Sequence, residues 1–203
     1  MLTREAAVAC VLALLAERPE PDSGDHSSRL ICIDGPAGAG KTTWSAQLAR
    51  ALRSAGLASA EDGDGSGEQS VQVLHLDDTY DGWQGLPGVA PRLLSEVIEP
   101  LRSGRPASYA RYDWAAGAFS ERIAVPPSEV LILEGVGSGH RCLESVRDLL
   151  VWVAAPDSLC WSRGLARDGE GMRAEWAAWK ADEAAYFHEQ DLPARADLIV
   201  DGR

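Results

Sequence analysis

Short apolar runs alternate with longer amphipathic stretches along most of the chain. The runs long enough for strands lie at 29–33, 71–78, 129–135 and 196–202, and a turn of helix leading into a strand is expected at 145–156. Helical periodicity marks the segments 42–56, 93–104, 158–168 and 172–190. This alternation predicts an α/β fold in which helices cover a parallel sheet of about five strands.

The chain is expected to form a single domain over residues 1–203. Residues 1–28 should form an amphipathic helix ending before Pro19, followed by a linker, because Glu17 breaks the apolar run too early for a secretory signal. The acidic, glycine-rich segment 57–70 is expected to be a flexible loop. No stretch is long enough to span a bilayer.

A glycine-rich bend joins the first expected strand to the first helix, in the sequence ICIDGPAGAGKTTW at 31–44. Its spacing is that of a P-loop, whose backbone N–H groups and positive helix end hold a polyphosphate. The lysine would reach the β- and γ-phosphates of ATP, and the first threonine would bind Mg²⁺. A glycine turn without a ligand is the alternative, which the flanking strand and helix disfavour. The expected nucleotide contacts are Gly35, Ala37, Gly38, Ala39, Gly40, Lys41, Thr42 and Thr43.

Acidic residues follow two of the expected strands. Asp77 and Asp78 come after the second strand and Glu134 ends the third, and ligands of parallel sheets bind at these carboxyl ends. A carboxylate there could take a proton from an acceptor hydroxyl or hold Mg²⁺, whereas turn capping is the alternative for the aspartates. The predicted metal ligands are Thr42, Asp77 and Glu134.

Arginines cluster in the segment WSRGLARDGEGMR. Arg163 and Arg167 lie four residues apart on one helical face, and Arg173 follows a plausible hinge. Residues 160–190 are therefore expected to form a lid and its following helix, with guanidinium groups that neutralise a transferring phosphoryl group. A solvated helix face is the alternative. The predicted catalytic residues are Lys41, Asp77, Arg163 and Arg167.

Composition narrows the class of protein. The net charge of -12 disfavours a nucleic acid or a membrane as the main partner, although local donors and Mg²⁺ can still hold ATP. Four cysteines without C-x-x-C spacing indicate reduced thiols in the cytoplasm. The chain has no asparagine, so it lacks the N-K-x-D segment of a regulatory GTPase. Composition does not decide whether the chain forms a homo-oligomer, which stays possible.

The chain resembles the uridine kinase, phosphoribulokinase and nicotinamide riboside kinase group of P-loop kinases. The segments that carry the resemblance are GPAGAGKTT, HLDDTY, ARYDW and VLILEG in that order, with WSRGLARD after them. The resemblance implies ATP and Mg²⁺ as cofactors and a small-molecule acceptor. It assigns Asp77 as the base, places Tyr80 near the acceptor, puts Tyr112 and Asp113 in the acceptor pocket, and gives Glu134 a part in organising Mg²⁺.

The acceptor is less clearly implied. Uridine kinases follow their YDF segment with a histidine and an arginine, and residues 115–122 offer no histidine, so a pyrimidine is not implied. Trp83 could stack on a ring or close over a sugar, whereas Trp176 and Trp179 fit a packing stripe better than a ligand wall. The favoured activity is phosphoryl transfer to a hydroxyl of a nucleoside-like metabolite. A kinase for a sugar or an antibiotic hydroxyl and a non-catalytic nucleotide-binding protein are the alternatives. The expected substrate contacts are Asp78, Tyr80, Trp83, Tyr112, Asp113 and Arg173.

Overall fold

The computed structural model describes residues 1–17, 28–55 and 71–203. The expected linker after Glu17 and the expected acidic loop at 57–70 lie outside these ranges. Within the described ranges, no helix combines the length and the apolar character needed to cross a membrane.

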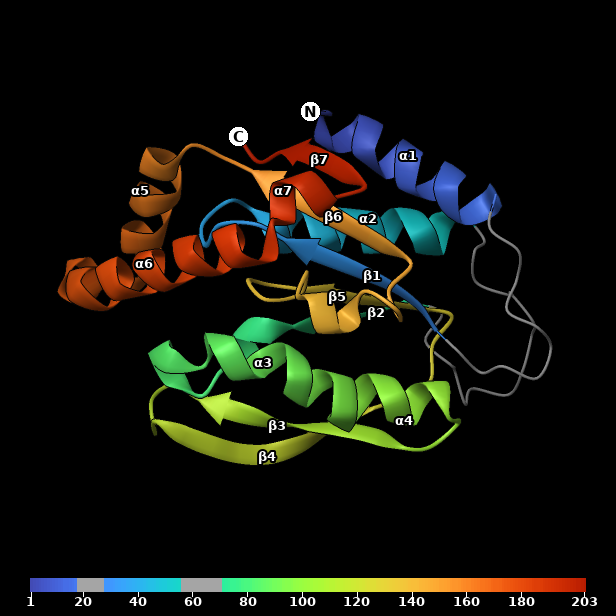
Figure 1. Cartoon of the computed structure of the whole chain (residues 1–203), viewed down its shortest axis with the longest axis horizontal. Helices are drawn as coiled ribbons and strands as arrows, with labels where there is room; N and C mark the ends of the chain where they lie inside the picture. Colours follow the sequence, from blue (N-terminus) through green and yellow to red (C-terminus); the bar gives the residue numbers. More distant parts are fainter. Residues whose placement is uncertain (18–27, 56–70) are drawn as a thin grey trace.

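The predicted α/β fold is confirmed, with a central sheet of five parallel strands in the order β2-β5-β1-β6-β7. Strand β1, which leads into the P-loop, pairs with β5 on one side and with β6 on the other (Figure 1). Helices cover both faces, so the central strands β1, β5 and β6 are mainly apolar and buried along their length. The strand bounds are β1 Arg29–Asp34, β2 Val71–His75, β5 Val130–Glu134, β6 Leu149–Ala154 and β7 Leu198–Asp201.

Helices α1 (Arg4–Glu17) and α2 (Lys41–Ser54) cover one face of the sheet (Figure 1). In α1 the buried residues are four positions apart, at Ala7, Val11 and Leu15, so one stripe of the helix packs inward. This stripe and the inner side of α2 form one core cluster with the strands.

The other face carries a longer helical segment than the sequence predicts. It runs through α3 (Leu86–Leu93), a π turn (Leu94–Ile98) and α4 (Glu99–Arg102), whereas the expected helix began at residue 93. The short helix α7 (Leu192–Arg195) also lies in this layer. A turn of helix was expected within 145–156, but the structure has a 3-10 turn earlier, at Arg141–Leu143.

A β-hairpin packs beneath α3 and α4 and forms a second, two-stranded sheet (Figure 1). Its strands are β3 (Ala107–Asp113) and β4 (Ala118–Val125), paired antiparallel. The sequence does not reveal this hairpin, because only the last residue of β4 is fully buried and most of the strand is exposed. The hairpin turn brings Trp114 toward the carboxyl edge of the main sheet, where the candidate site lies.

Helices α5 (Asp157–Asp168) and α6 (Arg173–Gln190) extend beyond the carboxyl ends of the strands, at the left of Figure 1. A 3-10 turn at Glu170–Met172 joins them. The segment expected to act as a lid therefore lies above the edge of the sheet at which ligands of parallel sheets bind.

Candidate functional site

The loop between β1 and α2 has the backbone of a phosphate cradle. Gly38 has φ of 85°, and a β-carbon there would lie 2.4 Å from the carbonyl oxygen of Cys160. Only glycine fits this position, because it tolerates positive φ and leaves room for α5. Helix α2 then starts at Lys41 without a side-chain cap, so its first N–H groups are available for an anion.

Lys41 is held against this loop. Its Nζ donates to the carbonyl oxygens of Gly35 at 2.7 Å and Pro36 at 3.0 Å, and the side chain is almost fully buried. An ammonium group has three N–H donors, so two fix its position and one can address a phosphate. These two hydrogen bonds fix the ammonium group against the loop.

A cavity of about 750 Å³ opens in front of the loop. Six of the eight predicted nucleotide contacts line it, namely Ala37, Gly38, Gly40, Lys41, Thr42 and Thr43. Gly35 and Ala39 shape the loop without lining the cavity. The structure also brings seven further predicted residues to the same cavity: Asp77, Asp78, Tyr80, Trp83, Glu134, Arg163 and Arg167.

Three predicted substrate contacts do not line the cavity. Tyr112 packs edge-on against Trp114, at 5.2 Å between ring centroids, and the carboxylate of Asp113 caps its own turn by accepting from two backbone N–H groups. Arg173 pairs with Glu170 on the outside of the α5–α6 turn. The hairpin instead contributes Trp114, which the sequence analysis did not single out.

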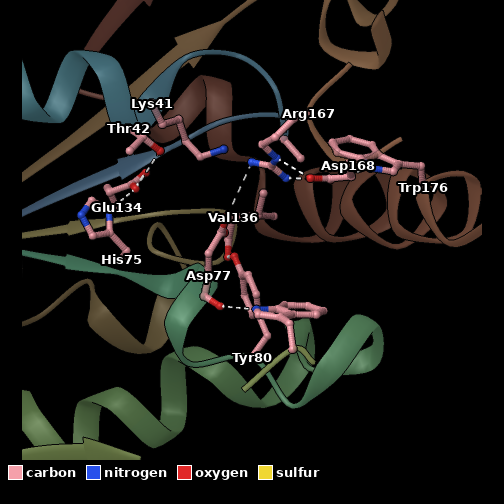
Figure 2. A network of polar contacts seen from close by, with 12 residues as sticks. Lys41, Thr42, His75, Asp77, Tyr80, Glu134, Val136, Arg167, Asp168 and Trp176 are labelled. Carbon is pink, nitrogen blue, oxygen red and sulfur yellow. Dashed lines mark hydrogen bonds and ion pairs between the residues drawn. The ribbon is translucent and has the colours of Figure 1, made fainter. Parts of the chain in front are cut away.

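Two of the three residues expected to hold Mg²⁺, Thr42 and Glu134, are hydrogen-bonded beside the P-loop, whereas Asp77 faces Arg167 instead. The hydroxyl of Thr42 donates to Oε1 of Glu134 at 3.0 Å, and the same oxygen lies 2.5 Å from Nδ1 of His75 (Figure 2). This hydrogen bond raises the pKa of His75 above its ordinary value, although partial burial opposes the rise.

These oxygen donors fit Mg²⁺, which takes one or two protein carboxylates and completes its shell with water and substrate phosphates. The described residues contain no cluster of three or more His, Cys, Asp or Glu side chains that could hold a metal by themselves. Thr42 and Glu134 therefore suit an ion that arrives with a nucleotide.

Asp77 faces Arg167 across the cavity (Figure 2). Its Oδ2 lies 4.0 Å from Nη1 of Arg167, and 63% of its side chain is exposed within the cavity. The surrounding walls displace water and raise the pKa of Asp77, while the charge of Lys41 opposes that rise. The backbone carbonyl of Asp77 accepts a hydrogen bond from Nε1 of Trp114 at 3.0 Å, which fixes this short segment against the hairpin.

The two arginines of α5 differ in their surroundings. Nη1 of Arg163 donates to the carbonyl oxygens of Gly38 and Gly202, so this side chain ties α5 to the P-loop. Nε and Nη2 of Arg167 donate to the two carboxylate oxygens of Asp168, at 2.7 and 3.0 Å. Its remaining terminal nitrogen, Nη1, points toward Asp77.

The model of the Phosphoribulokinase / Uridine kinase family matches residues 30–200. The chain belongs to this family. Members of the phosphoribulokinase/uridine kinase family are kinases, so family membership supports an ATP-dependent phosphotransferase. No curated protein sequence matches the chain.

Solved structures of similar fold cover nearly the whole chain. A possible uridine kinase from Bacillus stearothermophilus has a TM-score of 0.65 at 19% identity, with 97% of this chain and 98% of that chain covered. A Silicibacter sp. TM1040 protein proposed as a fructose transport system kinase has a TM-score of 0.65 at 21% identity, with 95% and 98% covered. A D-glycerate 3-kinase from Cryptococcus neoformans var. grubii has a TM-score of 0.55 at 15% identity, with 98% and 95% covered. At these identities the likeness shows the fold alone.

In this family member the side of the cavity away from the P-loop is aromatic. Trp83 lies at its centre, with ring centroids 5.6 Å from Trp114, 6.4 Å from Trp176 and 6.2 Å from Trp179. Trp176 and Trp179 are almost fully buried, as expected of a packing stripe, and they also line the cavity. The same two tryptophans therefore pack in the core and form part of the cavity wall.

Four residues with polar roles at the site escaped the sequence analysis. His75 and Asp168 each neighbour a predicted residue, at two positions and one position respectively, so a search around the predicted residues would have included them. Glu183 of α6 accepts the N–H of Ala37 at 3.0 Å and pairs with Lys180, and nothing in its local sequence marks this contact.

Asp34, at the end of β1, is the fourth. Its carboxylate is fully buried and accepts from the N–H groups of Gly35, Gly137 and Gly139 and from the hydroxyl of Tyr186. Burial raises the pKa of Asp34 to about 6, although these backbone donors and the charge of Lys41 oppose the rise. The Asp34 carboxylate thus links three parts of the chain: the P-loop, the loop that follows β5, and helix α6.

Proposed function

We propose that the chain transfers the γ-phosphate of ATP, in the presence of Mg²⁺, to a hydroxyl of a small metabolite, with a nucleoside or nucleoside-like compound as the favoured acceptor. The observation that carries this proposal is one cavity that is lined both by the P-loop and by the exposed carboxylate of Asp77. Phosphoryl transfer depends mainly on positioning and charge neutralisation, and this cavity offers groups for both.

In the proposed reaction, Asp77 takes the proton from the acceptor hydroxyl as its oxygen bonds to the γ-phosphorus. The bond between that phosphorus and the bridging oxygen breaks, and ADP leaves with the bond's electron pair. Lys41 and Arg167 lie where they can neutralise the charge on the transferring group. Mg²⁺, held by Thr42 and Glu134 together with the nucleotide, would supply further charge neutralisation.

The aromatic side of the cavity supports a nucleoside-like acceptor, because indole rings pack well against planar bases. Indoles also pack against the apolar faces of sugars, so a sugar or an antibiotic hydroxyl stays within the range to be tested. A non-catalytic nucleotide-binding protein would leave the exposed carboxylate of Asp77 without a role.

The test is release of ADP by the purified protein with ATP and Mg²⁺, screened against nucleosides, nucleotides, sugars and amino-sugar compounds. The active acceptor should lose its effect in Asp77→Asn, by about 100-fold or more for loss of a general base. Asp113→Asn is the matched control, because Asp113 caps its own turn and does not line the cavity. Nucleotide binding without stimulation by any acceptor would favour the non-catalytic alternative.

A further inference from the structure

Helix α6 carries one buried stripe whose residues change character along the helix. Its members, spaced three or four residues apart, are Trp176, Trp179, Glu183, Tyr186 and Gln190. The two tryptophans line the cavity, whereas the next two members are polar and contact the P-loop and the residue before it. A carboxylate on the inward side of a helix is uncommon, because burial of an unpartnered charge is costly. Glu183 therefore needs partners inside the protein.

The backbone of the P-loop is the first partner of Glu183. Its Oε2 accepts the N–H of Ala37 at 3.0 Å, and the residue is only 3% exposed. Ala37 lines the cavity and Glu183 does not, so the carboxylate meets the loop from outside the cavity. Three residues further along α6, the hydroxyl of Tyr186 donates to Oδ2 of Asp34 at 3.2 Å. Helix α6 thus holds the first part of the loop at two points.

The second partner of Glu183 is a lysine on the same helix. Lys180 lies three residues earlier and forms an ion pair with Oε1 of Glu183, and 16% of the lysine side chain is exposed. The chain has only two lysines, and the other, Lys41, bonds to the P-loop directly. Without Lys180, the carboxylate would place an uncompensated negative charge beside the loop that binds phosphates.

A P-loop is electrostatically costly when it holds no phosphate. Its N–H groups converge on the space that the phosphates would fill, so their dipoles repel one another. An acceptor that holds one N–H from the other side stabilises the same backbone arrangement in the free protein. Less order then has to be gained when the nucleotide binds, which raises its affinity.

We propose that Glu183 is a positioning residue for nucleotide binding. Through the N–H of Ala37 it holds the P-loop in the arrangement that phosphates need, and Lys180 cancels its charge so that the phosphates are not repelled. This inference rests on the nucleotide-binding part of the proposed function and goes beyond it, because it gives a role to two residues that do not line the cavity. The helix that supplies two cavity tryptophans then also sets the shape of the loop.

Two double variants isolate the hydrogen bond to Ala37. Lys180→Met/Glu183→Gln keeps an oxygen that can accept the N–H, whereas Lys180→Met/Glu183→Met keeps the length of the side chain and removes the acceptor. Neither leaves a buried charge, so both should fold, and thermal unfolding checks this. Glu189→Met is the control, because it removes an exposed acid from the same helix.

The first measurement is amide hydrogen exchange of Ala37 in the nucleotide-free protein, followed by NMR. Exchange should be at least about tenfold faster in the Met/Met variant than in the Met/Gln variant, because only the second keeps the acceptor. The second measurement is the Kd of a fluorescent ATP analogue with Mg²⁺. It should be about tenfold higher in the Met/Met variant, which is the size expected for loss of one hydrogen bond.

The single variant Lys180→Met tests the role of charge. It leaves the Glu183 carboxylate uncompensated near the phosphates, so the Kd of the ATP analogue should rise about tenfold. Adding Glu183→Gln should bring the Kd back to within about threefold of the parent value. A pair with only a structural role would not show this rescue, because the second substitution removes a further interaction.

Three results would overturn the inference and leave the kinase proposal standing. Equal exchange of Ala37 in the two double variants would show that Glu183 does not hold this N–H. Tighter nucleotide binding in the Met/Met variant would show that the carboxylate competes with phosphate. Nucleotide affinities equal to that of Glu189→Met in every variant would show that the pair does not contribute to binding. If the parent protein binds no nucleotide, the proposed function fails and this inference fails with it.

Discussion

The indole of Trp176 occupies the space beside Gly164 that a side chain would need. A β-carbon on Gly164 would lie 2.3 Å from two ring atoms of Trp176. The contact between α5 and α6 therefore depends on a glycine in the first helix and a tryptophan in the second, and both residues line the cavity.

Gly164→Ala should destabilise the protein by about 1–3 kcal/mol, because the new methyl group overpacks this contact. Each kcal/mol lost should lower the thermal midpoint by about 2–4 °C in a chain of this size. Gly171→Ala is the control, since nothing lies within 4 Å of a β-carbon there. A smaller ring in the double variant Gly164→Ala/Trp176→Phe should recover part of the loss. Equal midpoints for the two alanine variants would contradict the prediction.

Asp168→Asn should lower kcat about tenfold and leave ATP binding nearly unchanged. Burial alone would raise the pKa of Asp168, but hydrogen bonds from Arg167 and Trp176 lower it, so the ionised form is the one that grips the arginine. Without the two hydrogen bonds to Asp168, Arg167 is free to form a closer ion pair with Asp77, the proposed base. Steady-state kinetics with Asp182→Asn, an exposed acid on α6, as control will check this; a change in ATP affinity alone would count against it.

Lys41→Ala should weaken ATP binding roughly 10- to 100-fold, the effect expected for loss of one charge-assisted hydrogen bond, and should remove most transfer activity. The variant should still fold, because the P-loop keeps its glycines and alanine is a good residue for the first turn of α2. Titration with a fluorescent nucleotide and a thermal melt measure the two outcomes. Arg50→Ala removes an exposed cation from the same helix and should change neither.

The buried carboxylate of Asp34 predicts a pH dependence of stability. Its pKa is about 6 in the folded protein against 3.8 for the ordinary value, so between these pH values the folded state holds a proton that the unfolded state releases. Stability should therefore fall as pH rises through this window, by about 3 kcal/mol from this group.

Urea unfolding of the parent protein and of Asp34→Asn at pH 4, 5, 6 and 7 tests this dependence. The asparagine variant loses a hydrogen-bond acceptor at every pH, so the comparison concerns slopes and not absolute values. The parent should lose about 2.4 kcal/mol more than the variant between pH 4 and pH 7, slightly less than the full effect because the unfolded state is already partly ionised at pH 4. Parallel profiles would show that Asp34 does not change its protonation in this window.

The main sheet was predictable because its strands are short, mainly apolar runs, and all but β6 end at or just before glycine or acidic residues. The hairpin was not, because most of β4 is exposed and its sequence, AFSERIAV, shows no buried alternation. Local sequence also could not show that α3, the π turn and α4 form one continuous layer, since Pro91 and Pro100 interrupt the helical pattern.

The P-loop end of the site followed from the sequence because its residues are neighbours in the chain. The aromatic side was predicted only in part. Tyr80 and Trp83 were expected substrate contacts and line the cavity, whereas Trp114 and Trp176 come from distant segments and meet Trp83 only in the folded protein. The prediction chose Tyr112 and Asp113, whereas the turn of the hairpin directs the next residue, Trp114, into the cavity. A shift of one or two residues at a turn decides which side chain faces a ligand.

The order of strands in the sheet has a kinetic consequence. Strand β1 finds both of its neighbours far downstream, with Arg29 opposite Val130 and Ile31 opposite Leu149. The entropy cost of closing loops of this length must be met before strand pairing contributes any stability. The sheet should therefore form more slowly than the helices. During synthesis, the strand that carries the phosphate loop emerges early and waits for about a hundred further residues before it is paired on either side. Nucleotide can therefore stabilise only the last stages of folding.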